Sequence, residues 1–351
     1  MLILSNALTN VVDEGCIKIA NNLVKRIKKA DESTFVVAFE RISDLADEYV
    51  TVNKLLLNRK LISKIKQNKG SFMYIPFPAK TRSVSLRIFI LSLFARRNFS
   101  VILCMTSEID VLSKLLFKMS RAKFVVFSKR SFELYSSVVS EKKVEYLRIG
   151  VDIERFVPAL KDTAEMLKEK YGFDPRKKLV LHVGHLNKGR NIQQLEKLTK
   201  EYQVLLVTST QTQDEQDMEL KKELIAHGIS IIDTYIPDIE EIYQMADVYF
   251  FPVLEQGHCI DVPLSCLEAA ACNKPIVTTD FGEMREFVGK KGFYFIESFE
   301  QQELLLKIRQ ALEAEVVSSR QSVLEYDWSS AIEFFISDKE NLSNDYYKKA
   351  T

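Results

Sequence analysis

The chain has 351 residues and a mass of 40.5 kDa, and its 49 Lys and Arg nearly balance its 48 Asp and Glu. A composition that is 46% hydrophobic and 28% charged excludes a disordered or low-complexity chain. The near-neutral total argues against a nucleic-acid binder, and the length predicts two domains. Charge is unevenly distributed, since residues 1–149 hold 26 basic and 13 acidic residues and 150–351 hold 23 and 35.

The cysteines and the apolar stretches indicate a compartment. The cysteine number is odd and no CxxC pair occurs, which predicts free thiols in a reducing cytosol; the residues are Cys16, Cys104, Cys259, Cys266 and Cys272. The N-terminus lacks the basic segment of a signal peptide, and the apolar run 88–95 is too short to span a membrane. We therefore expect a cytoplasmic protein that is soluble or lies on a surface.

Short apolar runs alternate with helical patterns throughout the chain. In the first half the expected strands are 2–5, 34–39, 72–77, 100–105 and 123–128, and the expected helices are 15–29, 53–68, 83–97 and 107–119. In the second half the expected strands are 178–184, 203–209, 229–235, 248–253, 275–280 and 293–298, with helices between them. This alternation predicts an α/β fold of two doubly wound, Rossmann-like domains facing a cleft, with ligands beyond the carboxyl ends of the strands.

The turn after the first expected strand has no GxGxxG fingerprint. The sequence VVDEGCIK (11–18) occupies it instead, with Gly15 opening the next helix. One interpretation is an ordinary turn glycine before a helix. The other places Asp13 and Glu14 at the cleft, where a carboxylate can act as a base.

The segment VGHLNKGRNI (183–192) joins an expected strand to an expected helix. Gly184 and Gly189 allow a ligand to approach the backbone, and the helix N-terminus favours an anion. His185, Lys188 and Arg190 supply donors for phosphate oxygens, and the guanidinium offers a planar pair of them. The alternative is a solvated basic loop.

The segment 258–288 contains the most concentrated pattern. Glu268 lies early in a helix rich in alanine, just before the strand that begins at Pro275. A carboxylate there can accept hydrogen bonds from both ribose hydroxyls, while the alanines allow the helix to pack closely on the sheet. Taken alone, a glutamate on a helix is more often an idle surface residue.

Five segments taken together resemble a known family. In chain order they are GVDIERFVP (150–158), VGHLNKGRNI (183–192), ADVYFFPV (246–253), LSCLEAAACNKPIVTTDFGEMREFV (264–288) and YDWSSAIEFF (326–335). They resemble the retaining glycosyltransferase family 4, of GT-B fold. The resemblance covers about 150–335, and 1–149 match mainly by topology.

The resemblance implies both domain bounds and roles. An N-terminal acceptor-side domain (1–149) is expected to include a C-terminal helix, about 328–351, that crosses back to it, and 150–327 is expected to bind the nucleotide sugar. The family's diphosphate pair falls on His185 and Arg190, and its ribose glutamate on Glu268. The expected donor contacts are Gly184, Lys188, Arg190, Asp261, Leu264 and Glu268.

Three positions depart from the family pattern. A first glutamate is usual eight residues before the ribose glutamate, but that position is Ile260, with Asp261 beside it and Glu255 upstream. At the position of the usual phosphate-binding arginine this chain has His185, which is cationic only part of the time near neutral pH. Family members often have a histidine near the donor sugar in the first domain, yet all four here lie in the second half: His182, His185, His227 and His258.

These observations predict an enzyme, a hexosyltransferase. The resemblance implies that it uses a UDP-sugar or GDP-sugar, retains the anomeric configuration and needs no metal or other cofactor. The absence of a DxD triplet is consistent with metal independence. Arg190, Lys188 and His185 would stabilise the leaving diphosphate. If the reaction is instead inverting, Asp13 or Glu14 is the expected base, followed by Glu108 or Asp110. The alternatives are a sugar-nucleotide epimerase and a non-catalytic binder of sugar nucleotides or glycans.

Residues 49–107 contain eleven Lys or Arg and no Asp or Glu. The stretches 53–68 and 83–97 combine this charge with apolar residues at helical spacing, which is typical either of core-facing helices or of helices that bind a membrane surface. Anionic lipid would attract the first domain, so we expect a peripheral protein on the inner face of the cell membrane, with a glycan or lipid-linked acceptor.

Overall fold

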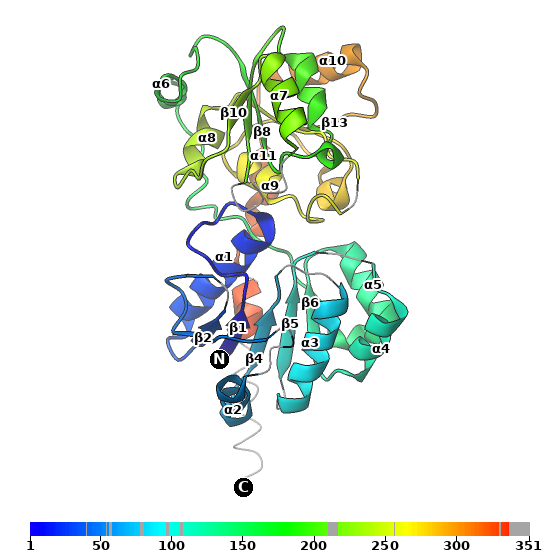
Figure 1. The fold of residues 1–351 in the computed structure, drawn as a ribbon. Coiled ribbons are helices and arrows are strands. Elements are labelled where there is room, and N and C mark those ends of the chain that lie inside the picture. The colour runs from blue at the N-terminus through cyan, green and yellow to red at the C-terminus, as the bar shows by residue number, and fades with distance from the viewer. Residues whose placement is uncertain are drawn as a thin grey trace. The chain divides into compact units, whose positions relative to one another are not determined.

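The computed structural model (Figure 1) describes residues 1–39, 41–53, 55, 58–77, 81–95, 98–105, 108–209, 217–255, 257–329 and 331–336. The chain forms two compact units. The N-terminal unit contains 1–149 and 328–351, and the second unit contains 150–327.

The N-terminal unit is built on a parallel sheet in the strand order β3-β2-β1-β4-β5-β6-β7. Its strands are β1 (Leu2–Ser5), β2 (Phe35–Ala38), β3 (Glu48–Tyr49), β4 (Phe72–Ile75), β5 (Phe99–Leu103), β6 (Lys123–Val126) and β7 (Val144–Tyr146). Its helices are α1 (Gly15–Ala30), α2 (Arg59–Gln67), α3 (Thr81–Phe94), α4 (Val111–Met119) and α5 (Lys129–Val139), with a 3-10 turn η1 (Glu141–Lys143).

The second unit repeats this architecture around a parallel sheet in the order β10-β9-β8-β11-β12-β13. Its strands are β8 (Leu179–Val183), β9 (Gln203–Val207), β10 (Ser230–Ile232), β11 (Val248–Phe251), β12 (Ile276–Thr278) and β13 (Phe293–Phe295). Its α-helices are α6 (Lys161–Lys170), α7 (Met218–Ala226), α8 (Ile239–Met245), α9 (Leu264–Ala271), α10 (Gln301–Leu312) and α11 (Ser319–Val323). The 3-10 segments are η2 (Lys188–Arg190), η3 (Ile192–Leu198), η5 (Gly282–Phe287) and η6 (Leu324–Tyr326).

Each sheet has a point at which the strand order reverses. In the N-terminal unit it lies between β1 and β4, and in the second unit between β8 and β11. Loops that leave neighbouring strands in opposite directions open a crevice at the carboxyl ends there, which is where ligands bind in doubly wound folds.

Every strand that the sequence predicts is present, and the fold is the expected α/β class with two parallel sheets. Two helices are shorter than expected because a side chain caps each of them: Asn58 accepts hydrogen bonds from the first turn of α2, and Asp110 from that of α4. The edge strands β3 and β7, of two and three residues, were not predicted. All five cysteines are free and buried.

The C-terminal helix expected at about 328–349 falls partly outside the described residues. Residues 331–336 are helical, and Trp328 is fully buried within the N-terminal unit. The Arg26 guanidinium of α1 lies 5.7 Å from the centre of the Trp328 ring. This segment therefore returns to the N-terminal unit, whereas 337–351 lie outside the described residues.

Part of the positive charge of the basic stretch 49–107 is neutralised in the structure by a carboxylate just outside it. Lys60 and Lys64 of α2 both contact Glu48 of β3, each at 2.8 Å, and they lower the pKa of that carboxyl by hydrogen bonding to it. Leu61 and Ile65 of the same helix are buried in the core. Of the two interpretations of 53–68, the structure favours the core-facing helix, because α2 uses its apolar side for packing.

None of the described helices is long and apolar enough to cross a membrane.

Candidate functional site

The loop after β8 lies at the switch point of the second sheet. Gly184 follows the strand directly, and its N–H donates to the Val207 carbonyl at 2.9 Å. The short helix η2 comes next and ends at Asn191, which has the left-handed φ of 56° that asparagine tolerates well. The Asn191 side-chain amide donates to the Pro252 carbonyl at 3.1 Å, so the loop is tied to the end of β11.

Arg190 is a buried cation at this strand end. Only 7% of the residue is exposed, and its Nε donates to the His258 carbonyl at 3.0 Å. A Cβ atom on Gly184 would lie 2.4 Å from Nη1 of Arg190, so the guanidinium packs where another residue would place its side chain. A buried guanidinium beside a bare strand end is suited to bind an oxyanion with two parallel hydrogen bonds.

Two histidines border this arginine. His182 is fully buried on β8, and its Nδ1 lies 2.8 Å from the Phe250 carbonyl, which fixes the proton on Nδ1. Burial lowers the pKa of His182 to about 3. Burial, with the nearby charge of Arg190, also lowers the pKa of His185 to about 3. His185 is therefore neutral near pH 7, which corrects the expectation of a partly cationic phosphate ligand.

The other residues of η2 are more open. Lys188 is largely exposed, and its Nζ lies 3.9 Å from Oδ2 of Asp217. Gly189 is covered by the ring of His258, because a Cβ atom there would come within 2.4 Å of that ring. A ligand was expected to approach the backbone at Gly189, but the ring of His258 occupies that space. The imidazole of His258 in turn lies 3.5 Å from the Glu255 carboxylate.

Glu268 is held by a residue that the sequence did not indicate. The carboxylate is buried on α9, and its Oε2 accepts a 2.7 Å hydrogen bond from the Tyr243 hydroxyl of α8. Burial and the charge of Glu268 raise the pKa of Tyr243 well above its ordinary value, so the hydroxyl stays a donor. The expectation of an idle surface glutamate is wrong for this residue. The alanines that follow it are fully buried, as close helix packing requires.

Arg190 and Glu268 act on the same buried thiol. Burial raises the pKa of Cys266 well above its ordinary value; Cys259 and Glu268 raise it further, while Arg190 lowers it. Both charged side chains therefore lie near the start of α9, although they are more than seventy residues apart in the chain. The structure thus brings the two predicted anchors into one part of the second unit.

The segment before α9 is packed tightly. Ile260, Asp261 and Leu264 are all buried. The Asp261 carbonyl accepts a 2.8 Å hydrogen bond from the Glu283 N–H, and a Cβ atom on Gly282 would lie 2.2 Å from that oxygen. Gly282 also has a left-handed φ of 55°. Asp261 and Leu264 therefore belong to a rigid turn that joins the start of α9 to η5.

The predicted bases lie in the N-terminal unit. Glu14 caps α1, since its Oε2 accepts a 3.0 Å hydrogen bond from the Ile17 N–H, and Asp13 precedes it. Glu108 is exposed just before α4. Asp110 caps α4 and is ion-paired with Arg82, and these hydrogen bonds lower the pKa of its carboxyl to about 2. Asp110 is too weakly basic for proton abstraction near neutral pH.

Within the described part of the chain, no group of three or more His, Cys, Asp or Glu side chains is arranged to hold a metal ion. The sequence did not indicate three partners of the site: Tyr243, Asn191 and His258. Only the pattern typical of left-handed turns, an asparagine at the end of a short helix, could have indicated Asn191. Nothing local connects Tyr243 with Glu268, since they are on different helices.

Part of the second unit resembles a known protein family. Residues 177–314, which contain Gly184, Arg190 and Glu268, match the family model of glycosyl transferases group 1. This segment is similar to the group 1 glycosyltransferases. The chain is also 29% identical over 153 residues, 41% of its length, to "Putative glycosyltransferase EpsD" of Bacillus subtilis (strain 168). That match spans 39% of the relative's own length. The family is one of transferases, which agrees with the expected enzyme class.

Solved structures share the fold over nearly the whole chain. A glycosyltransferase from Rickettsia africae ESF-5 has a TM-score of 0.75 at 15% identity, with 97% of this chain and 98% of that one covered. Anabaena HepE, solved with UDP-glucose, has a TM-score of 0.73 at 17% identity, with 98% and 100% covered. At these identities the likeness concerns the fold, and it confirms the expected GT-B class.

Proposed function

We propose that this protein transfers a hexose-type sugar from a nucleoside diphosphate sugar to a glycan or lipid-linked acceptor. The observation that carries the proposal is the buried guanidinium of Arg190 against Gly184, at the switch point of a sheet within the segment that matches the group 1 glycosyltransferases. A relative of the same fold was solved with UDP-glucose, which supports a nucleotide sugar as donor.

In this proposal Arg190 and Lys188 bind the diphosphate. Charge accumulates on the diphosphate as the bond to the sugar breaks, and cations already in place stabilise that charge without reorganising. His185 is neutral in the structure and serves as a hydrogen-bonding group. Glu268, oriented by Tyr243, accepts hydrogen bonds from the ribose hydroxyls. Gly184, Asp261 and Leu264 border this site. The cations Arg190 and Lys188 neutralise the diphosphate without a metal.

We propose a retaining route. Two of the four predicted bases are helix caps: Glu14 caps α1, and Asp110 caps α4 with its pKa lowered to about 2. Neutralising Glu14 or Asp13 should therefore leave donor cleavage measurable. Analysis of the product anomer separates the routes: an inverted product, or activity abolished in Asp13→Asn with donor binding intact, would contradict retention.

The membrane contact was predicted for the stretches 53–68 and 83–97; this proposal keeps α3 from the second stretch and replaces α2 with α4. Val84, Ile88 and Leu91 of α3 pack into the core, whereas Leu93 on the same helix is 61% exposed. The neighbouring helix α4 exposes a run of apolar residues beside Lys114 and Lys118; these are Val111, Leu112, Leu115 and Met119. Exposed apolar and basic side chains together are typical of a surface that binds anionic lipid. A peripheral position on the inner face of the cell membrane is therefore part of this proposal.

Vesicle sedimentation tests the membrane contact. The wild type should sediment with anionic vesicles more than with neutral ones, and Leu112→Ser with Leu115→Ser should reduce that fraction. The matched control replaces the exposed Ile225 and Leu306 of the second unit with serine. Equal sedimentation with anionic and neutral vesicles would refute the proposed membrane contact.

The donor assignment is tested by calorimetry and turnover. UDP and GDP should bind the wild type. Arg190→Ala and Glu268→Ala should each lower the affinity for the more tightly bound of the two nucleotides by at least about tenfold, since each removes charge-assisted or paired hydrogen bonds. Arg309→Ala is the control, because Arg309 forms an exposed pair with Glu201. Unchanged affinity in both test variants would refute the assignment.

A non-catalytic binder is the second candidate. It is favoured by the buried Ile260 at the position of the usual first glutamate and by the neutral His185. Incubation with labelled sugar nucleotides and a membrane extract separates the two, because a binder retains the donor without forming a glycan. Isomerised donor would instead indicate an epimerase.

A further inference from the structure

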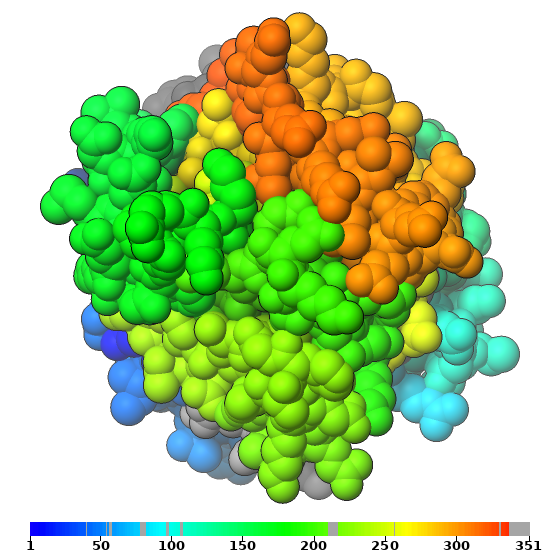
Figure 2. Space-filling view, turned by 90° about the horizontal axis from the view of Figure 1, so that it is seen from above, coloured from blue at the N-terminus to red at the C-terminus, as the bar shows by residue number. Residues whose placement is uncertain are grey.

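A second recess lies at the opposite edge of the second sheet from Gly184. A cavity of about 590 Å³ is lined by Lys178, Asp247 and Pro275, which immediately precede β8, β11 and β12, and by one side of α6. Parallel strands begin at one edge and end at the other, so this cavity is separate from the proposed donor site. In Figure 2, yellow atoms are visible deep between the green segment at the left and the orange segment.

The lining is strongly cationic. Its charged members are Lys161, Lys168, Arg176, Lys177, Lys178 and Lys274 against Glu165 and Asp247. A third carboxylate, Asp174, pairs with Arg176 from outside the lining. This concentration of positive charge is opposite to the net charge of the second unit, because residues 150–327 hold 20 basic and 31 acidic residues. Such an excess is not an average property of the unit.

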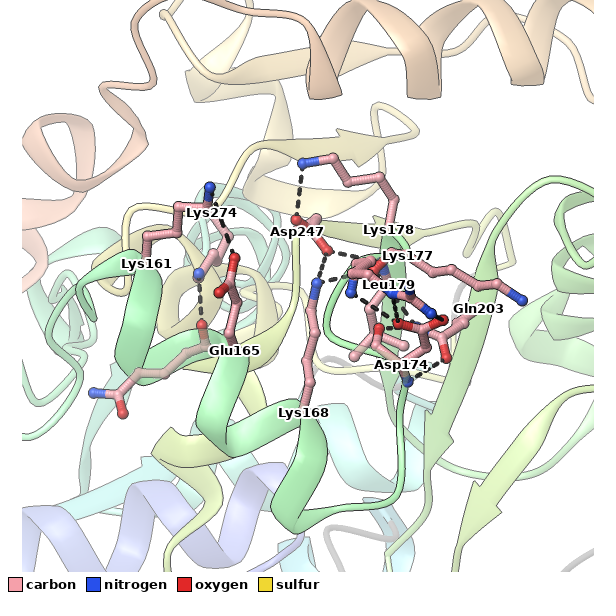
Figure 3. Close-up of polar contacts among 12 residues, drawn as sticks. Lys161, Glu165, Lys168, Asp174, Lys177, Lys178, Leu179, Gln203, Asp247 and Lys274 are labelled. Atoms are coloured by element: carbon pink, nitrogen blue, oxygen red, sulfur yellow. Dashed lines mark hydrogen bonds and ion pairs between the residues drawn. The ribbon is translucent and has the colours of Figure 1, made fainter.

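One carboxylate in this cavity, that of Asp247, forms ion pairs with two ammonium groups. Asp247 accepts from Lys168 Nζ at 2.6 Å through Oδ2 and from Lys178 Nζ at 3.1 Å through Oδ1, and Oδ2 also accepts from the Leu179 N–H at 2.8 Å (Figure 3). Lys168 is nearly buried, with 5% of its side chain exposed. The Asp247 carboxylate is thus fully engaged and leaves an excess of positive charge.

Lys274 adds a cation that has no carboxylate partner within the described part of the chain. Its Nζ donates to the Gln244 carbonyl at 2.7 Å, which is a neutral acceptor. Burial lowers the pKa of Lys274, and Lys168 and Lys178 lower it further by repulsion, against the opposing effects of Cys272 and Asp247. Lys161 reaches Glu165 only at 3.7 Å. Like charges are therefore held together around an open volume.

We propose that this cavity binds a small polyanion that bears phosphate groups. Lysine ammonium groups are compact, rotatable donors that suit phosphate oxygens, and the volume is that of sites for small molecules. An anion would neutralise the excess charge of Lys178, Lys161 and Lys274 together. A membrane surface is disfavoured because Lys168 and Lys274 are too recessed for a bilayer to reach them.

Calorimetry with inorganic pyrophosphate tests the proposal on the full chain. The wild type should show two classes of site. Lys161→Gln with Lys178→Gln should weaken one class by at least roughly tenfold and leave the other, since two charge-assisted donors are lost. The control, Lys200→Gln with Lys222→Gln, removes the same charge from exposed positions of the same unit and should leave both classes. Arg190→Ala should remove only the class that belongs to the donor site.

Amine footprinting locates the anion directly. Acetylation of Lys178, followed by mass spectrometry, should slow when pyrophosphate is present, while acetylation of Lys200 should not. Unchanged binding in the Lys161 and Lys178 double variant, an equal loss in the Lys200 and Lys222 control, or a single class that Arg190→Ala abolishes would each overturn the proposal. The test lysines are both more than half exposed, so the double variant is expected to fold.

Discussion

Tyr243 and Glu268 are joined by a 2.7 Å hydrogen bond although both side chains are buried. The bond connects α8 to α9 and fixes the carboxylate that is proposed to hold the ribose. Because the pKa of Tyr243 is raised well above its ordinary value by burial and by Glu268, the hydroxyl donates throughout the physiological range. A buried carboxylate without this donor would be costly.

Tyr243→Phe should therefore lower the free energy of unfolding by about 1–3 kcal/mol and weaken nucleotide binding by several-fold. Urea denaturation and calorimetry with UDP and GDP measure the two effects. Tyr294→Phe is the control, because the Tyr294 hydroxyl makes no hydrogen bond within the described part of the chain. A loss of stability without any change in affinity would separate Glu268 from the nucleotide.

Gly184→Ala should displace the arginine. The added Cβ would lie 2.4 Å from Nη1 of Arg190 and 2.9 Å from Nε2 of His182, which is itself held by Phe250. We expect the affinity for nucleoside diphosphates to fall at least about tenfold, as when a charge-assisted pair of bonds is lost. Calorimetry measures it, with Gly70→Ala as control because the nearest atom there is 3.7 Å from the added Cβ.

His182 makes stability depend on pH. Its pKa is about 3 when folded and 6.5 ordinarily, so between these values the unfolded chain binds a proton that the folded chain does not. Stability therefore falls as the pH drops below about 6.5, by roughly 2 kcal/mol at pH 5 for this residue. His182→Asn keeps a donor for the Phe250 carbonyl and should remove this part of the decline, leaving the part that His185 contributes, whereas His227→Asn at an exposed position should not change it. Parallel declines in the two variants would contradict this reasoning.

Asp247→Asn should destabilise the second unit. Lys168 would remain nearly buried without its carboxylate and Lys178 would lose its ion pair, which together should lower the free energy of unfolding by about 2–4 kcal/mol. Urea denaturation measures the loss, and added pyrophosphate should recover part of it. Asp280→Asn, which breaks the exposed pair with Arg285, is expected to cost little.

Much of the fold was accessible from local pattern. Apolar strands alternating with helices predict two parallel doubly wound sheets, because strand and helix periodicities are properties of short segments. Gly184, Arg190 and Glu268 were also identifiable, since each lies at a strand end or helix start that the same pattern locates. The caps at Asn58 and Asp110 show the limit of this approach, because they shorten helices whose apolar spacing continues further.

What only the tertiary structure decided depends on residues distant in sequence. Glu48 neutralises Lys60 and Lys64 from another strand, burial makes His185 neutral, and Tyr243 reaches Glu268 from a neighbouring helix. The cationic cavity likewise gathers lysines from three separate segments around Asp247. The sequence by itself determined the two sheets and the order of their strand-end residues. Burial and charge pairing had to await the fold, because both depend on which segments pack together rather than on the neighbours along the chain.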